Sequence, residues 1–470
     1  MNTSSYPCKR LILICLSALL IASSRAQTAD WSAYLGTAAH SSYNDGSTAI
    51  TPTSAPNLIP KWTFIDPVPT LPGQPNAGFN ASPTVVNGRV YLGSNTGMFY
   101  ALDSGNGSLL WQKLLGYTTP LSCRYGHGVT STAAVATDPV DGALVIYVGG
   151  GDGYLYALDA DTGDTIWRTI VVDIGTTENS GYLWGSPLVI NNRVSIGISS
   201  ACDLPLIRGG LKSFDMHSGT LVRTYWTTPK GTPGASIWTS AASDGRSFWA
   251  TIGNGDAGDS FALVQLNANL RFKSKYTVPN TAGTDLDWGS SPTLFEAPLN
   301  GRRTRMVGAN QKNGTFYAFK AADLGSGPVW SRMVGVEGDL GTVGTCLAAP
   351  IWNATSKQLF VGSNQTVIGS AIFAGSIRSL DPANGAVVWE TGLTAGPVVG
   401  SPSLNGGGVL AAATYNLQNP TGNKVYLLDS SNGRVVTSLD AASPIFSQPV
   451  FADQLLLVAT SGGLLTAYGF

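Results

Sequence analysis

The sequence predicts an all-β fold assembled from eight repeated units of four strands each. Three observations lead to this prediction. The 470 residues include 57 Gly and 26 Pro, whereas only 12% are charged, which is typical of a chain with many turns and buried strands. Hydrophobic residues make up 43% of the chain, which excludes a disordered protein. Finally, one short phrase recurs along the chain at a spacing of roughly 50 residues.

The repeated phrase is clearest in two copies. Residues 97–103 read GMFYALD and residues 153–159 read GYLYALD, and each copy is followed by a Gly and then a Trp. Alternating apolar positions between Gly and Asn or Asp turns predict about four short strands in each unit. Weaker copies end at Asp215, Asn267, Lys320, Asp381, Asp429 and Gly469.

Units of this length predict a single eight-bladed β-propeller with four antiparallel strands in each blade, because one blade cannot bury both of its faces and stacks radially on its neighbours. The late Trp of each unit is expected to fill the space between blades. The last unit reaches only its third strand at Phe470, and residues 58–64, LIPKWTF, resemble the missing Trp-bearing strand. We expect this N-terminal strand to complete the last blade and protect its edge.

The first 26 residues resemble a secretory signal peptide, which leaves residues 27–470 as the propeller. Lys9 and Arg10 precede an uncharged stretch, and Ser24 and Ala26 offer small residues before a cleavage point. The protein is therefore expected to be secreted or periplasmic. The apolar stretch is too short to span a bilayer and no later one is long enough, so no integral membrane segment is predicted.

The cysteines that remain after cleavage are Cys123, Cys202 and Cys346. They predict one disulfide and one free or buried thiol, and all three pairings stay open. The chain has no C-x-x-C-H motif, so covalent c-type haem is not expected. The formal net charge is −1 and no basic run occurs, which argues against nucleic acid as a partner.

The phrase G-x-L-Y-A-L-D-x-x-T-G-x-x-x-W resembles the repeat of the pyrroloquinoline quinone (PQQ) enzyme superfamily across essentially all of residues 30–470. The resemblance implies an eight-bladed propeller. It does not specify the function, because the same repeat also occurs in an outer-membrane assembly lipoprotein that binds partners and no quinone. Four places are similar to the quinone-binding members, especially polyvinyl-alcohol and other quinoprotein alcohol dehydrogenases.

Each of the four places carries one candidate residue. Trp238, at the end of GASIW, resembles the Trp that lies under the flat quinone in that family. Asn254, in TIGN, is similar to a calcium ligand. Asp287, in DLDWGSSP, matches the catalytic base, and Lys312, in QKNG, resembles the cation that hydrogen-bonds the quinone carbonyls.

The chemistry of the family explains these residue types. Calcium held by oxygen ligands polarises a quinone carbonyl, a carboxylate takes the alcohol proton as hydride leaves, and a cation stabilises the growing charge on oxygen. Relatives also supply a Glu to calcium from the blade-three loop, where Asp203 is the only carboxylate here. The implied metal ligands are therefore Asn254, Asp203 and Asp287. Two family features are missing from the chain, namely a pair of adjacent cysteines and an Arg near residues 128–132.

Each candidate also has a purely structural explanation. Trp238 would pack against the next blade, Asp287 would cap a turn, Asn254 would occupy a left-handed turn, and Lys312 would be a solvated turn charge. Structural or solvated roles are likewise expected for the three histidines, His40, His127 and His217.

Two functions remain open. The first is a secreted or periplasmic PQQ-dependent dehydrogenase that oxidises a small alcohol or sugar, with PQQ and calcium as cofactors and an external electron acceptor. The second is a non-catalytic propeller that serves as a protein-binding or envelope-assembly scaffold. The sequence does not predict the oligomeric state.

Overall fold

The computed structural model describes Met1 and residues 29–68, 77–118, 127–174, 181–202, 205–279, 281 and 284–470. The predicted signal peptide lies outside these residues, as do Asp203 and Cys123. Within the described part, no helix has the length and apolar character needed to cross a membrane. Cys202 is disulfide-bonded and Cys346 is a buried free thiol, so the two pairings that include Cys346 are excluded.

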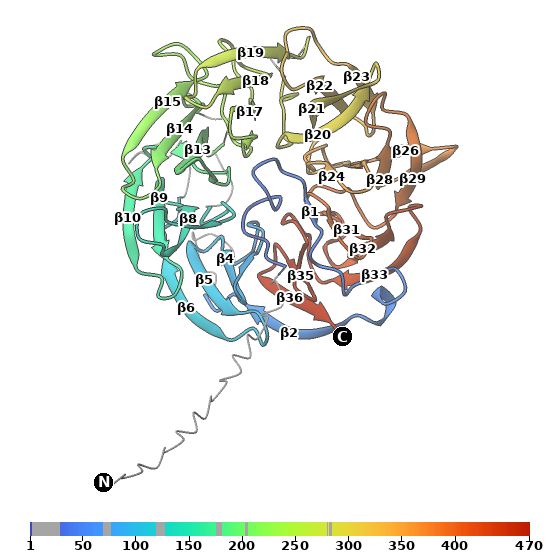
Figure 1. Cartoon of the computed structure of the whole chain (residues 1–470). Helices are drawn as coiled ribbons and strands as arrows, with labels where there is room; N and C mark the ends of the chain where they lie inside the picture. Colours follow the sequence, from blue (N-terminus) through green and yellow to red (C-terminus); the bar gives the residue numbers. More distant parts are fainter. Residues whose placement is uncertain are drawn as a thin grey trace.

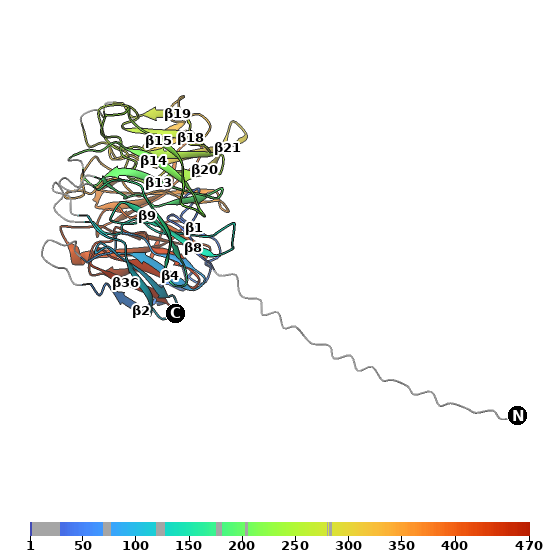
Figure 2. The same ribbon diagram turned by 90° about the vertical axis from the view of Figure 1, so that its left-hand side faces the viewer.

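The eight-bladed propeller is confirmed. Figure 1 shows the blades following one another around a central axis in chain order, and Figure 2 shows the same ring from its side. Blade one comprises β3 (Thr84–Val86), β4 (Arg89–Gly93), β5 (Met98–Asp103) and β6 (Leu109–Leu114), and blade two comprises β7 (Ala134–Thr137), β8 (Leu144–Gly149), β9 (Tyr154–Asp159) and β10 (Thr165–Ile170). Blade three comprises β12 (Leu188–Ile190), β13 (Arg193–Ser200), β14 (Gly210–Asp215) and β15 (Leu221–Trp226), with β11 (Gly181–Tyr182) added beside β13. Blade four comprises β16 (Ala242–Ser243), β17 (Ser247–Thr251), β18 (Ala262–Asn267) and β19 (Phe272–Thr277).

The other four blades repeat this antiparallel pattern. Blade five comprises β20 (Thr293–Leu299), β21 (Arg302–Asn310), β22 (Thr315–Lys320) and β23 (Trp330–Met333), and blade six comprises β24 (Ile351–Asn353), β25 (Gln358–Ser363), β28 (Gly375–Leu380) and β29 (Val387–Leu393), with the hairpin of β26 (Thr366–Ile368) and β27 (Ala371–Phe373). Blade seven comprises β30 (Ser403–Asn405), β31 (Val409–Ala413), β32 (Asn423–Asp429) and β33 (Val435–Ala441). Blade eight comprises β34 (Val450–Ala452), β35 (Leu455–Ala459), β36 (Leu464–Gly469) and β2 (Ile59–Ile65). Two short 3-10 helices, Ala55–Asn57 and Pro420–Gly422, lie in connections.

The closure of the ring by an N-terminal strand is also confirmed. Strand β2 pairs antiparallel with β36 and forms the outer strand of blade eight. Figure 1 shows β2, in blue, beside β36, in red, close to the C-terminus. Because the first and last parts of the chain share one sheet, the ring closes through backbone hydrogen bonds.

The late Trp of the repeat packs between blades, as predicted. In blade one, Trp111 lies against Gly163 of blade two, and its Nε1 donates a hydrogen bond to the carbonyl of Ala160 at 3.3 Å. A Cβ atom on Gly163 would lie 2.6 Å from the indole, so only glycine fits there. The same contact recurs for Trp62 on Gly107, Trp167 on Gly219, Trp330 on Gly385 and Trp389 on Gly433.

An N-terminal segment, residues 29–44, covers one end of the central channel, which the repeat pattern does not predict. Its carbonyl oxygens accept hydrogen bonds from inner strands of blades eight, one, two, four, five, six and seven. The accepting residues are Ala29, Trp31, Ser32, Ala38, Ala39, Ser41 and Ser42. Strand β1 (Tyr43–Asn44) then adds parallel to β30, and Figure 1 places it inside the ring. The segment therefore leaves the opposite end of the channel as the place for a site.

Candidate functional site

A ring of hydroxyl groups aligns the blades around the axis. The backbone N–H of Ser186 donates to Ser240 Oγ at 2.8 Å, and that of Ser240 donates to Ser291 Oγ at 3.0 Å. Equivalent bonds run from Ser82 to Thr132, from Thr132 to Ser186, from Ala349 to Ser401 and from Gln448 to Ser82. We call the residues joined by these bonds the ring positions. Residues that precede their own ring position by the same number of residues therefore share one layer of the channel.

Two cavities lie along the axis at this level. The smaller, about 90 Å³, is lined by the ring hydroxyls and by Tyr34 of the N-terminal segment. The larger, about 530 Å³, is lined by residues that shortly precede ring positions, such as Trp184, Trp238 and Asp287, and by residues that follow the second strand of a blade, such as Asn254 and Tyr415. The N-terminal segment instead contacts residues that shortly follow the ring positions. The larger pocket is therefore on the side of the ring away from that segment. Both cavities share Asn80, Trp184, Trp238, Leu347 and Phe446, which form the floor between them.

The larger pocket contains the four candidate residues that the structure describes, Trp238, Asn254, Asp287 and Lys312. They come from the inner side of blades four and five, where Trp238 precedes β16, Asn254 follows β17, Asp287 precedes β20 and Lys312 lies in the turn after β21. The fifth candidate, Asp203, lies outside the described residues, so its position relative to the pocket stays a prediction.

Trp238 is held in place by its neighbours. Its Nε1 donates a hydrogen bond to Asp287 Oδ2 at 2.9 Å, and the ammonium of Lys312 lies 5.3 Å from the ring centre. A Cβ atom at Gly253 or at Gly289 would lie 3.2 Å from the indole, so glycine at both positions leaves room for the ring. The indole is half-exposed and forms part of the pocket floor, and it does not simply fill a gap between blades.

Asp287 is a buried carboxylate paired with a buried lysine. Its side chain is 2% exposed, and burial raises its pKa to about 6, although Lys312 and the bond from Trp238 oppose the rise. Nζ of Lys312 lies 2.6 Å from Asp287 Oδ1 and donates a hydrogen bond to Asp285 Oδ1 at 2.7 Å. No backbone N–H in the described part bonds to the Asp287 carboxylate, so it does not cap a turn here.

Lys312 is not a solvated turn charge, because its side chain is only 15% exposed. Burial lowers the pKa of its ammonium, but Asp287 and Asp285 outweigh burial and the net pKa is raised. Lysine thus remains charged beside two carboxylates. Its backbone N–H also donates to the carbonyl of Asp287 at 3.2 Å, which fixes the turn against the strand entry of the same blade.

Two buried polar atoms on the pocket wall have no hydrogen-bond partner. They are Thr345 Oγ1 and Asn95 Oδ1. Asp287 Oδ1, by contrast, is held in an ion pair by Lys312 Nζ at 2.6 Å. Buried polar groups without partners are rare in folded proteins and call for an explanation. A polar ligand in this pocket would supply the missing partners.

Two aromatic residues of the pocket were missed from the sequence. Trp184 occupies in blade three the position that Trp238 occupies in blade four, two residues before the ring serine, and its Nε1 donates to the carbonyl of Ser200 at 3.1 Å. His127 lies 4.6 Å from Trp184, ring centre to ring centre, and burial lowers its pKa to about 4. The serine-proline signals that open the units are the sequence feature that would have placed Trp184 in register.

Asn254 lies at the pocket without a left-handed backbone. It is absent from the positive-φ residues, whereas Gly255 beside it has φ +156°. The backbone carbonyl of Asn254 accepts a hydrogen bond from the N–H of Ala235 at 2.7 Å. Asn254 also lines the pocket. Among the described residues, the Asn254 amide oxygen and the Asp287 carboxylate are oxygen donors of the kind that Ca²⁺ prefers.

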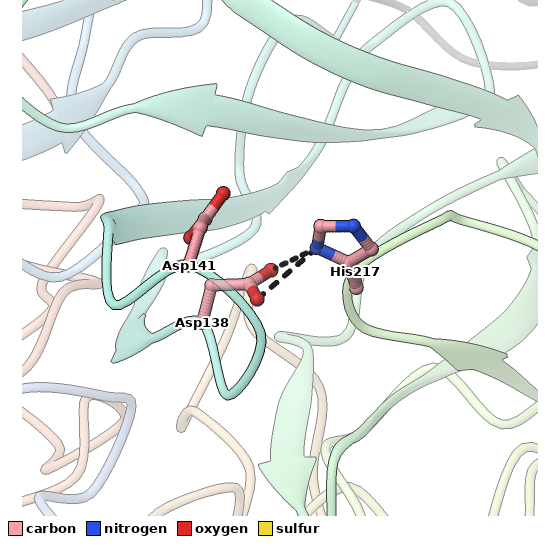
Figure 3. Close-up of side chains that lie close together, drawn as sticks. All are labelled: Asp138, Asp141 and His217. Carbon is pink, nitrogen blue, oxygen red and sulfur yellow. Dashed lines mark hydrogen bonds and ion pairs between the residues drawn. The ribbon is translucent and has the colours of Figure 1, made fainter.

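A second cluster of charged groups joins blades two and three and does not line the pocket. Figure 3 shows His217 pointing at the carboxylate of Asp138, with Asp141 close by. His217 Nδ1 lies 3.0 Å from Asp138 Oδ2, and this hydrogen bond raises the pKa of the histidine. In the described part of the chain, Asp138, Asp141 and His217 form the group of three metal-ligating side chains whose ligand atoms lie within 4.8 Å of one another.

Comparisons with known proteins agree with this fold. Residues 31–259 match the family model described as glucose/ethanol/alcohol dehydrogenase, beta-propeller domain, and residues 374–469 match the model of outer membrane protein assembly factor BamB. The described fold resembles the europium-containing methanol dehydrogenase, with a TM-score of 0.74, 16% identity and coverage of 94% of this chain and 98% of that one. It also resembles BamB from Moraxella catarrhalis, with a TM-score of 0.56, 14% identity and coverage of 88% and 100%. At these identities, the structures show the fold alone.

Curated relatives are more similar in sequence. Polyvinylalcohol dehydrogenase of Sphingopyxis sp. (strain 113P3) is 23% identical over 340 residues, which cover 61% of this chain and 48% of the relative. Quinohemoprotein alcohol dehydrogenase ADH-IIG of Pseudomonas putida is 26% identical over 288 residues, which cover 52% of this chain and 39% of the relative. The matches thus span about half or less of these relatives. The two family matches and the repeat phrase agree in indicating the PQQ-repeat β-propeller superfamily.

Proposed function

We propose that this protein is a PQQ-dependent dehydrogenase that oxidises an alcohol or a sugar, acts after export as a secreted or periplasmic protein, and passes electrons to an external acceptor. The observation that carries the proposal is the direct contact of Trp238, Asp287 and Lys312 in one pocket. The names of curated relatives, which include several alcohol dehydrogenases of the quinone type, support it.

The pocket fits a flat, polar cofactor. Its volume of about 530 Å³ is within the range of small-molecule sites. The floor offers Trp238, and the wall offers the unpartnered oxygens of Thr345 and Asn95. PQQ, when bound, would accept the hydride that leaves the alcohol carbon. Lys312 is the cation that would hydrogen-bond an oxygen of the bound cofactor, and the two half-exposed floor tryptophans would contact its rings.

Asp287 is the residue that would take the alcohol proton. With a pKa of about 6, its carboxylate is ionised at neutral pH and still basic enough to accept a proton, which is the range favoured for a general base. Trp238 and Lys312 orient the carboxylate by contacting Oδ2 and Oδ1, respectively. Burial of the carboxylate keeps bulk water from competing with the substrate for its oxygens.

Calcium is part of the proposal. Asn254 and Asp287 supply oxygen donors in the pocket, and the sequence prediction adds Asp203 from the blade-three loop. Because Ca²⁺ takes six to eight oxygen ligands, a bound cofactor and solvent would complete its shell. Removal of calcium with a chelator is expected to weaken PQQ binding. The measurement is a PQQ titration with and without about 1 mM Ca²⁺, a concentration near the Kd of typical extracellular calcium sites.

A test separates catalysis from binding. The purified protein, supplied with PQQ and Ca²⁺, is expected to bind PQQ and to reduce a dye with an alcohol. Asp287→Asn is expected to keep PQQ binding and to lose dye reduction, whereas Trp238→Ala is expected to lose binding. The matched control is Asp440→Asn, because Asp440 is 86% exposed on an outer strand. Dye reduction that survives in Asp287→Asn would contradict its role as the base.

The alternative function is a non-catalytic scaffold that binds proteins. The match of residues 374–469 to the BamB model favours it. Under this alternative the pocket has no cofactor, so wild-type protein takes up no PQQ, and Trp238→Ala and Asp287→Asn change only stability. The same titration therefore distinguishes the two functions.

A further inference from the structure

Thr345 carries a hydroxyl group that the folded chain leaves without a partner. Its side chain is 3% exposed, its Oγ1 has no hydrogen-bond partner, and it lines the large pocket. A threonine that only packs would normally bond to a nearby backbone group, as Thr239 does with the carbonyl of Thr251 at 3.3 Å. Thr345 therefore brings an unused hydrogen-bonding group to the lining of the pocket.

The register of the inner strands places Thr345 in the same layer as Asp287. Thr345 precedes the ring position of blade six, Ala349, by four residues, and Asp287 precedes the ring position of blade five, Ser291, by four. These two blades touch in the layer below, because a Cβ atom on Gly289 would overlap Leu347. Thr345 and Asp287 thus occupy equivalent positions in neighbouring blades, and both line the pocket.

The backbone around Thr345 is fixed by a buried amide. Nδ2 of Asn364 donates to the carbonyls of Val336 and Gly344 at 2.9 and 2.8 Å, and its Oδ1 accepts a hydrogen bond from Cys346 Sγ at 3.1 Å. Asn364 is fully buried, so these bonds are shielded from solvent. The Thr345 hydroxyl is therefore presented to the pocket by a rigid segment, which lowers the entropy cost of binding through it.

The surroundings of Thr345 indicate the kind of molecule that it would contact. Leu340 and Leu347 line the same pocket and offer apolar contacts. The cation of the pocket, Lys312, is already shared by two carboxylates, and the exposed acids Asp285 and Asp339 lie at the same pocket. When Lys312 contacts the bound cofactor, the carboxylate of an anionic substrate would meet two acidic side chains and no further cation among the described lining residues, which disfavours such a substrate.

We propose that Thr345 is a substrate-binding residue that positions an uncharged aliphatic alcohol beside Asp287. Its Oγ1–H donates a hydrogen bond to the hydroxyl oxygen of the alcohol, whose own O–H then points at the Asp287 carboxylate, while Leu340 and Leu347 contact the carbon chain. The inference rests on the proposed dehydrogenase function. It adds a substrate-positioning residue that the sequence resemblance does not contain.

The test compares Thr345→Val with wild type, with Thr345→Ser as the rescue variant. Thr355→Val is the matched control, because Thr355 is exposed on a turn of the same blade. PQQ affinity is measured by quenching of tryptophan fluorescence, and kcat and KM are measured by dye reduction with 1-butanol and with 4-hydroxybutanoate. The melting temperature of each cofactor-free variant is measured alongside.

We expect Thr345→Val to raise the KM for 1-butanol roughly five- to ten-fold, the size of one lost hydrogen bond, with PQQ affinity unchanged and Thr345→Ser close to wild type. Wild type is expected to prefer 1-butanol to 4-hydroxybutanoate. The melting temperature of Thr345→Val should not fall, because no internal bond is lost. An unchanged KM, a fall in PQQ affinity or a lower melting temperature overturns the inference. A wild-type protein that takes up no PQQ contradicts the proposed function itself, which is a separate outcome.

Discussion

Asp287→Asn is expected to remove a pH-dependent loss of stability from the cofactor-free protein. The pKa of Asp287 is about 6 in the folded protein and 3.8 in a model carboxyl group. Below pH 3.8 the group is protonated in both the folded and the unfolded chain and has no effect. Between these values the folded chain holds the proton more tightly, so its stability falls as pH rises. Above pH 6 the full cost is present, and about two pKa units correspond to about 3 kcal/mol.

The size of the effect on melting temperature follows from the length of the chain. Unfolding entropies of about 2 cal/mol/K per residue give about 0.9 kcal/mol/K for roughly 440 residues. About 2 kcal/mol of the cost develops between pH 4.5 and 7.5, so wild type should lose about 2 °C relative to Asp287→Asn over that interval. Asn keeps an oxygen that accepts the bond from Trp238 Nε1, so packing of the indole is preserved.

The assay is thermal unfolding of both proteins, without PQQ or Ca²⁺, at the two pH values. Asp440→Asn serves as the control, because its side chain is exposed and its difference from wild type should not follow the same course. A difference between wild type and Asp287→Asn that stays constant with pH, or that moves in favour of wild type as pH rises, would refute the burial argument for Asp287.

The remaining predictions concern the blades. Gly163→Ala should lower the melting temperature by more than Gly142→Ala: both residues have positive φ, near +76° and +77°, but only a Cβ atom at Gly163 meets the indole of Trp111, and such overlap costs about 1–3 kcal/mol. Equal losses in thermal unfolding would contradict the interblade role of the tryptophan. His217→Gln should destabilise the protein more at pH 6 than at pH 9, since the raised pKa of His217 beside Asp138 contributes stability below pH 6.5 that is lost as pH rises through the folded value. A larger loss at pH 9 would contradict that ion pair.

The parts of the fold that the sequence predicted are those encoded by local repetition. Each blade has its own strand alternation, turn residues and Trp, so the blade count and the partnership of β2 with β36 could be inferred from periodicity. The N-terminal segment could not be predicted, because it occurs once and is bound through its backbone carbonyls, which every residue possesses.

The site divides in the same way. Trp238, Asp287 and Lys312 stand in distinctive short phrases, so the sequence could bring them forward, and the structure places them in contact. Thr345 and His127 carry no such phrase. Thr345 becomes notable only because its hydroxyl is buried without a partner, and His127 because the fold brings it against Trp184. Both are properties of packing between blades, which a linear pattern does not contain.

The most direct test of the central claim is a titration of the purified protein with PQQ in the presence of Ca²⁺, followed by tryptophan fluorescence. If the pocket binds the cofactor over Trp238, the fluorescence is quenched in a saturable way at micromolar or lower PQQ, and Trp238→Phe removes a large part of the quenching. If wild-type protein shows no saturable quenching at those concentrations, the dehydrogenase proposal is wrong and the scaffold function is favoured.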